Sequence, residues 1–221
     1  MTPEPDDPKA IVARGYDAIA ERYLAWAMGV RVAERGGYLR IMHNSLPDGA
    51  AVLELGCGAG IPITQCLAER FTVTGVDLSI RQIELARRNV PTATFLHGDM
   101  TEMDFAPASF DGVCAFYAIM HLPREEHAAM LGRIGTWLRP NGLFVASFSH
   151  SGSAGEIEAD WLGAPMYFSG YDAETNRRLV TDAGLAIEIA QAETDDEFGK
   201  PATFFWIVAR KPRGDDERSN K

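Results

Sequence analysis

Short apolar runs rich in β-branched residues alternate with helical stretches from about residue 50 to residue 211, and this alternation limits the fold more than any other feature. Strands are predicted over 51–55, 72–76, 93–97, 111–117, 142–148, 186–192 and 203–210. Helices are predicted over 80–90, 124–138 and 173–183. Their starts are recognisable: Ser79 caps the first, Pro123 stands at the first turn of the second, and Asp172 caps the third. Such alternation predicts an α/β fold in which a doubly wound, mostly parallel sheet of seven strands carries helices on both faces.

The two ends of the chain depart from this pattern. Only the polar stretch ETDDEFGKP separates the last two predicted strands, so they are expected to pair as an antiparallel hairpin at the sheet edge. Apolar residues at helical spacing over about 10–46 predict N-terminal helices, with Gly36–Gly37 interrupting the second. The segment 150–170 is expected to be a loop. The chain 1–221 is interpreted as a single domain, with its core over 50–211.

The charge and the cysteines restrict the partners. The formal net charge is -10 and no basic stripe appears, which argues against nucleic acid and against anionic membranes as partners. Cys57, Cys66 and Cys114 are an odd number and lack metal-ligand spacing, so they are interpreted as reduced thiols and no metal site is predicted. Neither a signal peptide nor a membrane-spanning run is visible. We therefore expect a cytoplasmic protein that is a monomer or a homodimer.

A glycine-rich loop follows the first predicted strand, in VLELGCGAG. Dinucleotide-binding loops have the spacing G-x-G-x-x-G, but here Gly56, Gly58 and Gly60 are followed by Ile61 at the place of the last glycine. Glu54 precedes the loop, and its carboxylate would repel a pyrophosphate but could pair with an ammonium group. The loop is therefore better suited to a ligand with a cationic end than to a dinucleotide.

Acidic residues also end the next two predicted strands. Asp77 follows the loop by about twenty residues, where a carboxylate can reach a ribose diol. Asp99 ends the third strand beside Met100, where an acceptor and an apolar side chain could bind an adenine ring. Each acid alone could be a helix cap or a solvated turn. Together, at successive strand ends, they predict an adenosine site.

These motifs resemble those of the class I S-adenosylmethionine-dependent methyltransferases. The resemblance covers about Ile11 to Lys211 and rests on VLELGCGAG, VTGVDLS, HGDM, FDGVCAFYAIMHL and LRPNGLFVAS, in that order. It implies a Rossmann-like fold, S-adenosylmethionine as cofactor with S-adenosylhomocysteine as product, and an N-terminal helical lid over about 10–46. The segment YDAIAERY resembles the lid helix of the family.

The resemblance also implies roles for individual residues. At the adenosine end, Asp77 would bind both ribose hydroxyls, Leu78 would pack on adenine, and Asp99 with Met100 would hold the edge and face of the ring. At the methionine end, the three loop glycines would line the amino-acid moiety, with Glu54 nearby. The remaining contacts implied there are the backbone of Ala115 or Phe116 at the ammonium group and Tyr16 over the carboxylate.

The acceptor is expected beyond the carboxyl ends of the strands, under the segment 150–170. The side chains expected to contact it are Tyr23, Tyr117, Trp161, Met166, Tyr167 and Phe198. Local packing is the alternative for Trp161 and Tyr167. For Tyr23 the alternative is the core of the lid.

Two histidines are candidates for a general base. His121 lies just before the helix that Pro123 begins, and the positive end of that helix should keep its imidazole neutral. His150, at the end of the fifth strand, is the weaker candidate. For both, a structural hydrogen bond to the backbone is the alternative.

The sequence thus predicts an S-adenosylmethionine-dependent methyltransferase (EC 2.1.1) that acts on a small molecule, in specialised metabolism by analogy with the family. A nicotinamide-dependent oxidoreductase is one alternative, against which Glu54 and Ile61 argue. A methyltransferase-like module that binds cofactor without transfer is the other. The acceptor atom stays open among oxygen, nitrogen, carbon and sulfur.

Overall fold

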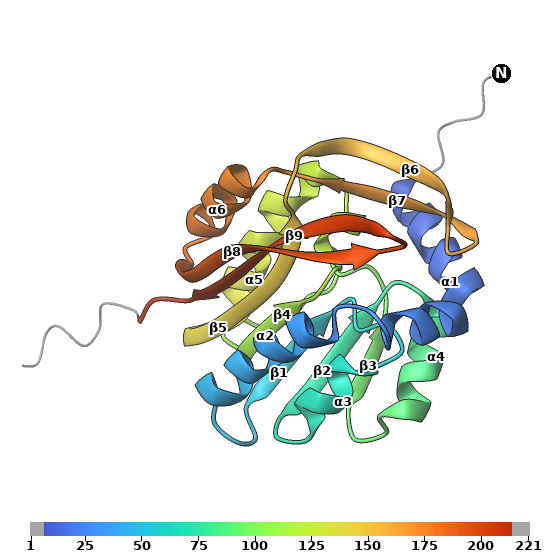
Figure 1. Ribbon diagram of the computed structural model, residues 1–221. Helices are drawn as coiled ribbons and strands as arrows, with labels where there is room; N and C mark the ends of the chain where they lie inside the picture. Colours follow the sequence, from blue (N-terminus) through green and yellow to red (C-terminus); the bar gives the residue numbers. More distant parts are fainter. Residues whose placement is uncertain (1–6, 214–221) are drawn as a thin grey trace, which may run out of the picture.

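A seven-stranded sheet with the order β3-β2-β1-β4-β5-β9-β8 forms the centre of the computed structural model, which describes residues 7–213 (Figure 1). The five strands that begin the sheet are mutually parallel, whereas β9 is antiparallel to both β5 and β8. The predicted fold class and the terminal hairpin are therefore confirmed. The strands are β1 (Ala51–Leu55), β2 (Thr72–Asp77), β3 (Thr94–His97), β4 (Phe110–Ala115), β5 (Leu138–Ser149), β8 (Ala186–Glu197) and β9 (Lys200–Arg210).

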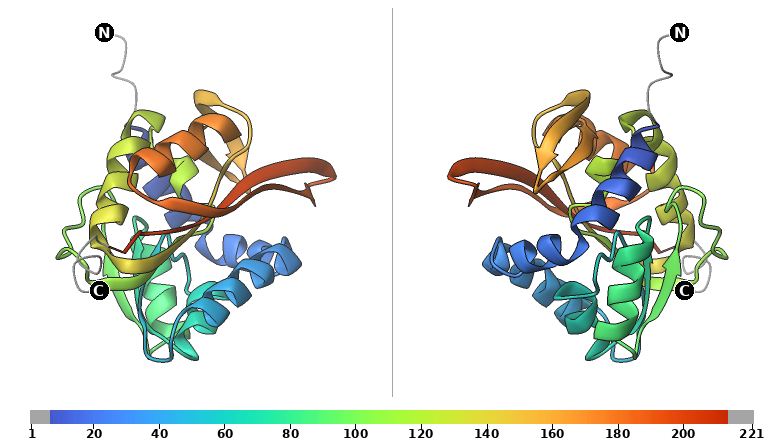
Figure 2. Two further views of the ribbon diagram at one scale, coloured as in Figure 1. Left: turned by 90° about the vertical axis from the view of Figure 1, so that its left-hand side faces the viewer. Right: turned by 90° about the vertical axis from the view of Figure 1, so that its right-hand side faces the viewer.

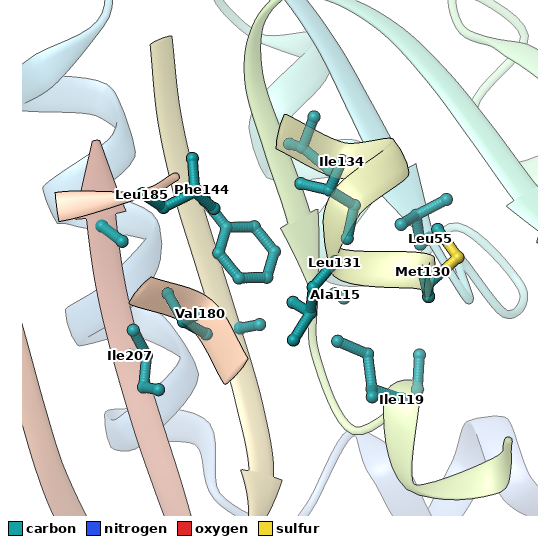
Figure 3. Close-up of a cluster of buried hydrophobic side chains, with 14 of the residues drawn as sticks. Leu55, Ala115, Ile119, Met130, Leu131, Ile134, Phe144, Val180, Leu185 and Ile207 are labelled. Atoms are coloured by element: carbon teal, nitrogen blue, oxygen red, sulfur yellow. The ribbon is translucent and has the colours of Figure 1, made fainter. Parts of the chain in front are cut away.

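Helices cover both faces of the sheet because successive strand residues point to opposite sides. On one face, Leu131 of α5 (His127–Trp137) and Val180 of α6 (Ala173–Asp182) pack with Phe144 in a buried apolar cluster (Figure 3). On the other, α2 (Val32–Ser45) and α3 (Ile63–Ala68) pack on the alternate strand residues. Complete burial of a large apolar side chain stabilises the fold by about 1.5–3 kcal/mol.

Two helix starts follow the predicted capping. The Ser79 hydroxyl accepts the amide of Gln82 at 3.1 Å at the start of α4 (Ile80–Asn89). The Asp172 carboxylate accepts the amide of Thr175 at 2.8 Å at the start of α6. The helix predicted over 124–138 begins instead as a 3₁₀ turn, Arg124–Glu126, and becomes α-helical at His127. Another 3₁₀ turn, Ile119–His121, precedes it.

The N-terminal region forms two helices, α1 (Pro8–Ala27) and α2, as predicted, but the interruption predicted at Gly36–Gly37 is wrong. The chain breaks earlier, at Arg31, which adopts the left-handed conformation with φ 50°. The Arg31 guanidinium binds the carboxylates of Glu34 and Glu197, and these contacts fix the break there. A glycine pair in a helix costs about 2 kcal/mol relative to alanine, which the packing of the α2 face offsets.

The segment 150–170 is not the predicted loop. It forms β6 (Ser153–Trp161) and β7 (Ala164–Gly170), an antiparallel pair separate from the main sheet. Leu162 and Gly163 join the two strands with φ values of 52° and 94°, the left-handed pair typical of a tight hairpin turn. The nearly continuous exposure of β6 conceals the alternation that usually identifies a strand.

The hairpin β6–β7 and the helix α1 lie at the same end of the molecule, above the carboxyl ends of the parallel strands (Figures 1 and 2). Gly15 permits their contact, because a Cβ atom at this position would lie 2.7 Å from the carbonyl oxygen of Pro165. Figure 2 shows the β8–β9 hairpin extending out from the rest of the sheet. No helix among residues 7–213 is long and apolar enough to cross a membrane.

Candidate functional site

Three adjoining cavities lie at the carboxyl ends of the parallel strands, under α1. The first extends from the ends of β2 and β3 to the segment after β4. The second lies between α1, the hairpin β6–β7 and β9, and the third lies behind the glycine loop. Tyr23 and Tyr117 line all three cavities. Tyr16 and His121 line the first and the second.

The first cavity brings together most of the residues predicted for the adenosine site. Its walls include the side chains of Asp77, Leu78, Asp99 and Met100. These side chains come from the ends of two neighbouring parallel strands, which is why they converge. Gly56, Gly58 and Phe116 continue the wall toward the third cavity. Ala115 is fully buried and does not line the cavity.

The glycine loop passes close to the segment after β4. Gly56 has φ 71°, and a Cβ atom there would lie 2.4 Å from the Cβ of Ala118. The amides of Gly56 and Cys57 both donate to the carbonyl of Val76, which holds the loop against β2. Gly60 does not line the cavities and instead closes the turn, donating to Cys57 at 3.0 Å.

Asp77 organises the loop as well as facing the first cavity. Its carboxylate accepts the amide of Gly58 at 2.8 Å and that of Ser79 at 2.9 Å. Burial raises the pKa of Asp77 to about 6, against the effect of these two hydrogen bonds. The charged carboxylate is thus held in place before any ligand arrives.

Asp99 is tied to the N-terminal helix. Its carboxylate pairs with the Lys9 ammonium at 2.8 Å and also accepts the amide and hydroxyl of Thr101. Lys9 reaches the carboxylate of Glu126 as well, at 2.5 Å. The start of α1 is therefore anchored at the end of the first cavity where adenine was predicted. Sequence reasoning did not identify Lys9, and a single lysine in a first helical turn gives no signal.

Glu54 lies behind the glycine loop rather than in the cavities. It is 2% exposed and accepts a hydrogen bond from the hydroxyl of Thr64. Burial raises the pKa of Glu54 to about 8, while the Thr64 hydrogen bond acts in the opposite direction. The side chain is therefore mostly uncharged at neutral pH, and the predicted pairing of its carboxylate with an ammonium group finds no support.

His121 is held between a carbonyl and a hydroxyl. Its Nδ1 lies 2.9 Å from the carbonyl oxygen of Tyr167, and its Nε2 lies 2.9 Å from the hydroxyl of Tyr16. Because a carbonyl only accepts, Nδ1 carries the proton and Nε2 accepts the Tyr16 hydrogen. Burial lowers the pKa of His121 to about 4. Desolvation, rather than a helix terminus, thus keeps the imidazole neutral.

His150 lies away from this arrangement. It is exposed at the end of β5, and its ring centroid is 6.4 Å from that of Phe205. It lines none of the three cavities, so the structure gives no geometric support to the second candidate base.

The second cavity has an aromatic wall. Trp161 lies with its ring centroid 5.7 Å from those of Tyr16, Tyr23 and Trp26. The remaining aromatic residues that line the cavity are Tyr117, Phe168 and Phe204. Of the residues predicted to contact the acceptor, Tyr23, Tyr117 and Trp161 line this cavity.

The other three do not line this cavity. Met166 is fully buried and packs against Gly15 beneath the hairpin. Tyr167 directs its carbonyl to His121, while its ring packs beside Gly155. Phe198 is 60% exposed and stacks on Trp26 at 5.5 Å, outside the cavity. Each of these side chains supports the wall without lining it.

Two arginines were not predicted. Arg31 lines the second cavity and binds Glu34, Glu197 and the carbonyl of Ala202. Arg35 lines the second and third cavities and is 5% exposed. Its guanidinium donates to the carbonyl of Ala27, but its buried Nε has no partner. Among the described residues, no group of His, Cys, Asp or Glu could hold a metal ion.

Comparison with known proteins identifies relatives of this chain. Residues 52–142 match a family model described as a methyltransferase domain. An uncharacterized methyltransferase of Synechocystis is 27% identical over 161 residues, 71% of this chain and 73% of the relative. A dTDP-3-amino-3,6-dideoxy-alpha-D-glucopyranose N,N-dimethyltransferase of Streptomyces fradiae is 35% identical over 107 residues. That match spans 48% of this chain and 42% of the Streptomyces protein.

A solved structure shares the fold. The 1,6-didemethyltoxoflavin-N1-methyltransferase of Burkholderia thailandensis, with 1,6-didemethyltoxoflavin and S-adenosylhomocysteine bound, has a TM-score of 0.70. It is 22% identical, and the alignment covers 96% of this chain and 93% of that one. The shared architecture extends beyond the matched domain to the N-terminal helices and the terminal hairpin.

Proposed function

Since the chain belongs to the class I S-adenosylmethionine-dependent methyltransferases, we propose that it transfers a methyl group to a small-molecule acceptor. The observation that carries this proposal is the meeting of two cavities of different character at Tyr16, Tyr23, Tyr117 and His121. One cavity has the polar strand ends suited to adenosine, and the other is walled by aromatic rings. When bound, S-adenosylmethionine supplies an electrophilic methyl carbon on a sulfonium leaving group.

The residues present fit this cofactor. In our proposal, Asp77 binds the ribose hydroxyls, Leu78 and Met100 cover adenine, and the Asp99 carboxylate holds the lid through Lys9 while bordering the base. Gly56 and Gly58 leave room for the amino-acid moiety beside Phe116. A positive φ at Gly56 and the tight approach of Ala118 support this cradle.

Arg35 supports a refined assignment for the cofactor carboxylate. Tyr16 was predicted to close over that group, but its hydroxyl is bound to His121. Arg35 instead presents a buried guanidinium with an unpartnered Nε beside the glycine loop. A buried charge without a counter-charge is costly. We therefore assign the methionine carboxylate to Arg35.

The chain's own residues would act on the acceptor mainly by positioning it and by excluding water. α1 and the hairpin β6–β7 enclose the second cavity, so the acceptor would react away from bulk solvent. The Tyr16 hydroxyl and His121 Nε2 form the polar point at which the cavities meet. If the acceptor loses a proton, this pair is the route we propose for it.

A role in specialised metabolism is supported by the two characterised relatives, whose names specify an amino sugar nucleotide and a didemethyltoxoflavin as substrates. The acidic net charge and the free cysteines support a cytoplasmic protein that does not bind nucleic acid. The comparisons do not favour an oxidoreductase or a module without transfer activity.

Calorimetric titration with two ligands tests the proposed function. The wild type should bind S-adenosylhomocysteine, and Arg35→Met should weaken that binding by about 1.5–3 kcal/mol through loss of a charged hydrogen bond. Binding of 5′-methylthioadenosine, which lacks the amino-acid group, should change little in the variant. Absence of S-adenosylhomocysteine binding to the wild type would contradict the function. Equal losses for both ligands would contradict only the assignment of Arg35.

A further inference from the structure

We propose that the acceptor is a flat aromatic molecule without a charged group, which presents an acidic O–H or ring N–H to Tyr16 and His121. This inference rests on the proposed methyl transfer and specifies the chemistry of the second cavity. It follows from three observations: the composition of the wall, the pairing of the charges in it, and the hydrogen bonding at its polar end.

The wall consists of rings that come from distant parts of the chain. Tyr23 and Trp26 belong to α1, Trp161 and Phe168 to the hairpin β6–β7, and Phe204 to β9. The Trp161 ring lies 5.8 Å from that of Phe168 at an interplanar angle of 75°, so the wall combines ring edges with ring faces. Aromatic ligands gain from such edge and face contacts beyond the burial of apolar area, whereas saturated ligands do not.

The charged side chains around the cavity are already paired. Arg31 binds Glu197 at 2.5 Å and Glu34 at 2.7 Å, and its guanidinium also lies 4.4 Å from the ring centroid of Phe204. Glu34 in turn accepts the hydroxyl of Tyr117 at 2.8 Å. The proposed function assigns Arg35 to the cofactor. No charged side chain that lines the second cavity is then left for the acceptor, and a charged acceptor would be desolvated without compensation.

The polar end of the cavity sets the chemistry of the reacting atom. Tyr16 donates to His121 Nε2 at 2.9 Å, and Nδ1 donates to the Tyr167 carbonyl. The acceptor O–H or N–H proton would pass to the Tyr16 oxygen as the Tyr16 proton passes to Nε2. The acceptor atom forms the new bond to the methyl carbon, and the electron pair of the broken carbon–sulfur bond stays on sulfur.

His121 is a weak base in this setting, because burial lowers its pKa to about 4. A weak base removes a proton only from a fairly acidic group. An aromatic hydroxyl, with an ordinary pKa of about 10, is far more acidic than an aliphatic alcohol. The polar end and the wall therefore favour the same class of acceptor.

A matched pair of probes tests the inference. 2-Naphthol and decahydro-2-naphthol have the same carbon skeleton and the same hydroxyl position, but only the first is flat and acidic. Each is titrated calorimetrically into the wild type saturated with S-adenosylhomocysteine. We expect 2-naphthol to bind about tenfold tighter or more. An apolar cavity without aromatic preference would bind the saturated probe as tightly or more tightly, and that result would overturn the proposal.

A third probe and two variants complete the test. 2-Naphthoate should bind more weakly than 2-naphthol. Tighter binding of this anion would refute the claim that the acceptor carries no charged group. Trp161→Leu and, independently, Phe168→Leu should each reduce the preference for 2-naphthol. Ile157→Leu is the matched control, because Ile157 is 55% exposed on the same hairpin and does not line the cavity.

The two proposals fail separately in this experiment. If S-adenosylhomocysteine does not bind, the proposed function fails before any acceptor is added. If S-adenosylhomocysteine binds Trp161→Leu and Phe168→Leu with unchanged affinity, the cofactor site is intact in these two variants. A preference for 2-naphthol that persists in both variants would then place the aromatic selectivity elsewhere and would overturn the inference.

Discussion

Replacing Glu54 by glutamine should stabilise this protein at neutral pH. Glu54 is 2% exposed beneath the glycine loop, and burial raises its pKa from 4.5 to about 8. Between these two values, the unfolded chain loses the proton while the folded protein keeps it. The unfolded state then binds fewer protons, so the free energy of unfolding falls as the pH rises from about 4.5 to about 8.

The size of the effect follows from the shift. The penalty grows by about 1.4 kcal/mol for each pH unit above 4.5, which gives about 3 kcal/mol at pH 7. Glutamine carries no proton to lose, and its amide oxygen can still accept the hydrogen bond of Thr64. Glu54→Gln should therefore be more stable by about 3 kcal/mol at pH 7 and of similar stability at pH 4. For a chain of this length, that gain raises the melting temperature by about 6–12 °C.

Denaturant unfolding of the ligand-free protein between pH 4 and pH 8 measures this directly. The control is Glu69→Gln, which makes the same substitution at an exposed position just after α3. The difference between Glu54→Gln and the wild type should widen as the pH rises, whereas the control should parallel the wild type. A constant difference across this range, or a variant less stable at pH 7, would refute the argument that Glu54 is buried as a neutral acid.

Further predictions concern the lid, the ribose site and the base. Lys9→Met should accelerate hydrogen exchange across α1, because it removes the ion pair with Asp99, and exchange equal to that of the wild type would refute the anchor. Asp77→Asn should weaken S-adenosylhomocysteine binding by about 1.5–3 kcal/mol in calorimetry, and an unchanged affinity would be inconsistent with a ribose contact. His121→Gln should slow transfer to a hydroxyl acceptor about 10²–10⁴-fold without lowering cofactor affinity. Because Nε2 of His121 must be unprotonated to accept a proton, the wild-type transfer rate should fall as the pH drops through about 4. A fall in rate centred at about pH 6.5, the ordinary pKa of histidine, would contradict this.

The sequence predicts the elements whose signals are local. The parallel strands were predicted from short apolar runs. The helix N-caps Ser79 and Asp172 lie where the sequence pattern predicts them. Residues that follow strands of a parallel sheet must converge at one edge, so the grouping of Asp77 with Asp99 could be predicted without knowledge of the packing.

The hairpin β6–β7 could not be predicted in the same way. Its first strand packs against α1 only through Trp161 and is exposed at nearly every other position, so β6 shows no alternation. The second strand is mostly buried and shows no clear alternation either. Its turn uses Leu162 at positive φ, where asparagine or glycine is the usual signal. The identity of this segment depends on its contact with α1 at Gly15, more than 130 residues away in the chain.

The sequence does carry a signal for Arg35, which we assign to the cofactor carboxylate but which was not predicted. On α2, Arg35, Tyr38, Leu39 and Met42 recur at positions i, i+3, i+4 and i+7, and all four are buried. A guanidinium on an otherwise apolar helix face must either be paired or serve a ligand, because an unpaired buried charge is costly. Whether the guanidinium is paired within the protein or binds a ligand depends on which residues the rest of the chain places against that face. The structure brings the glycine loop to that face and leaves Nε without a partner, which supports our assignment of Arg35 to the cofactor site.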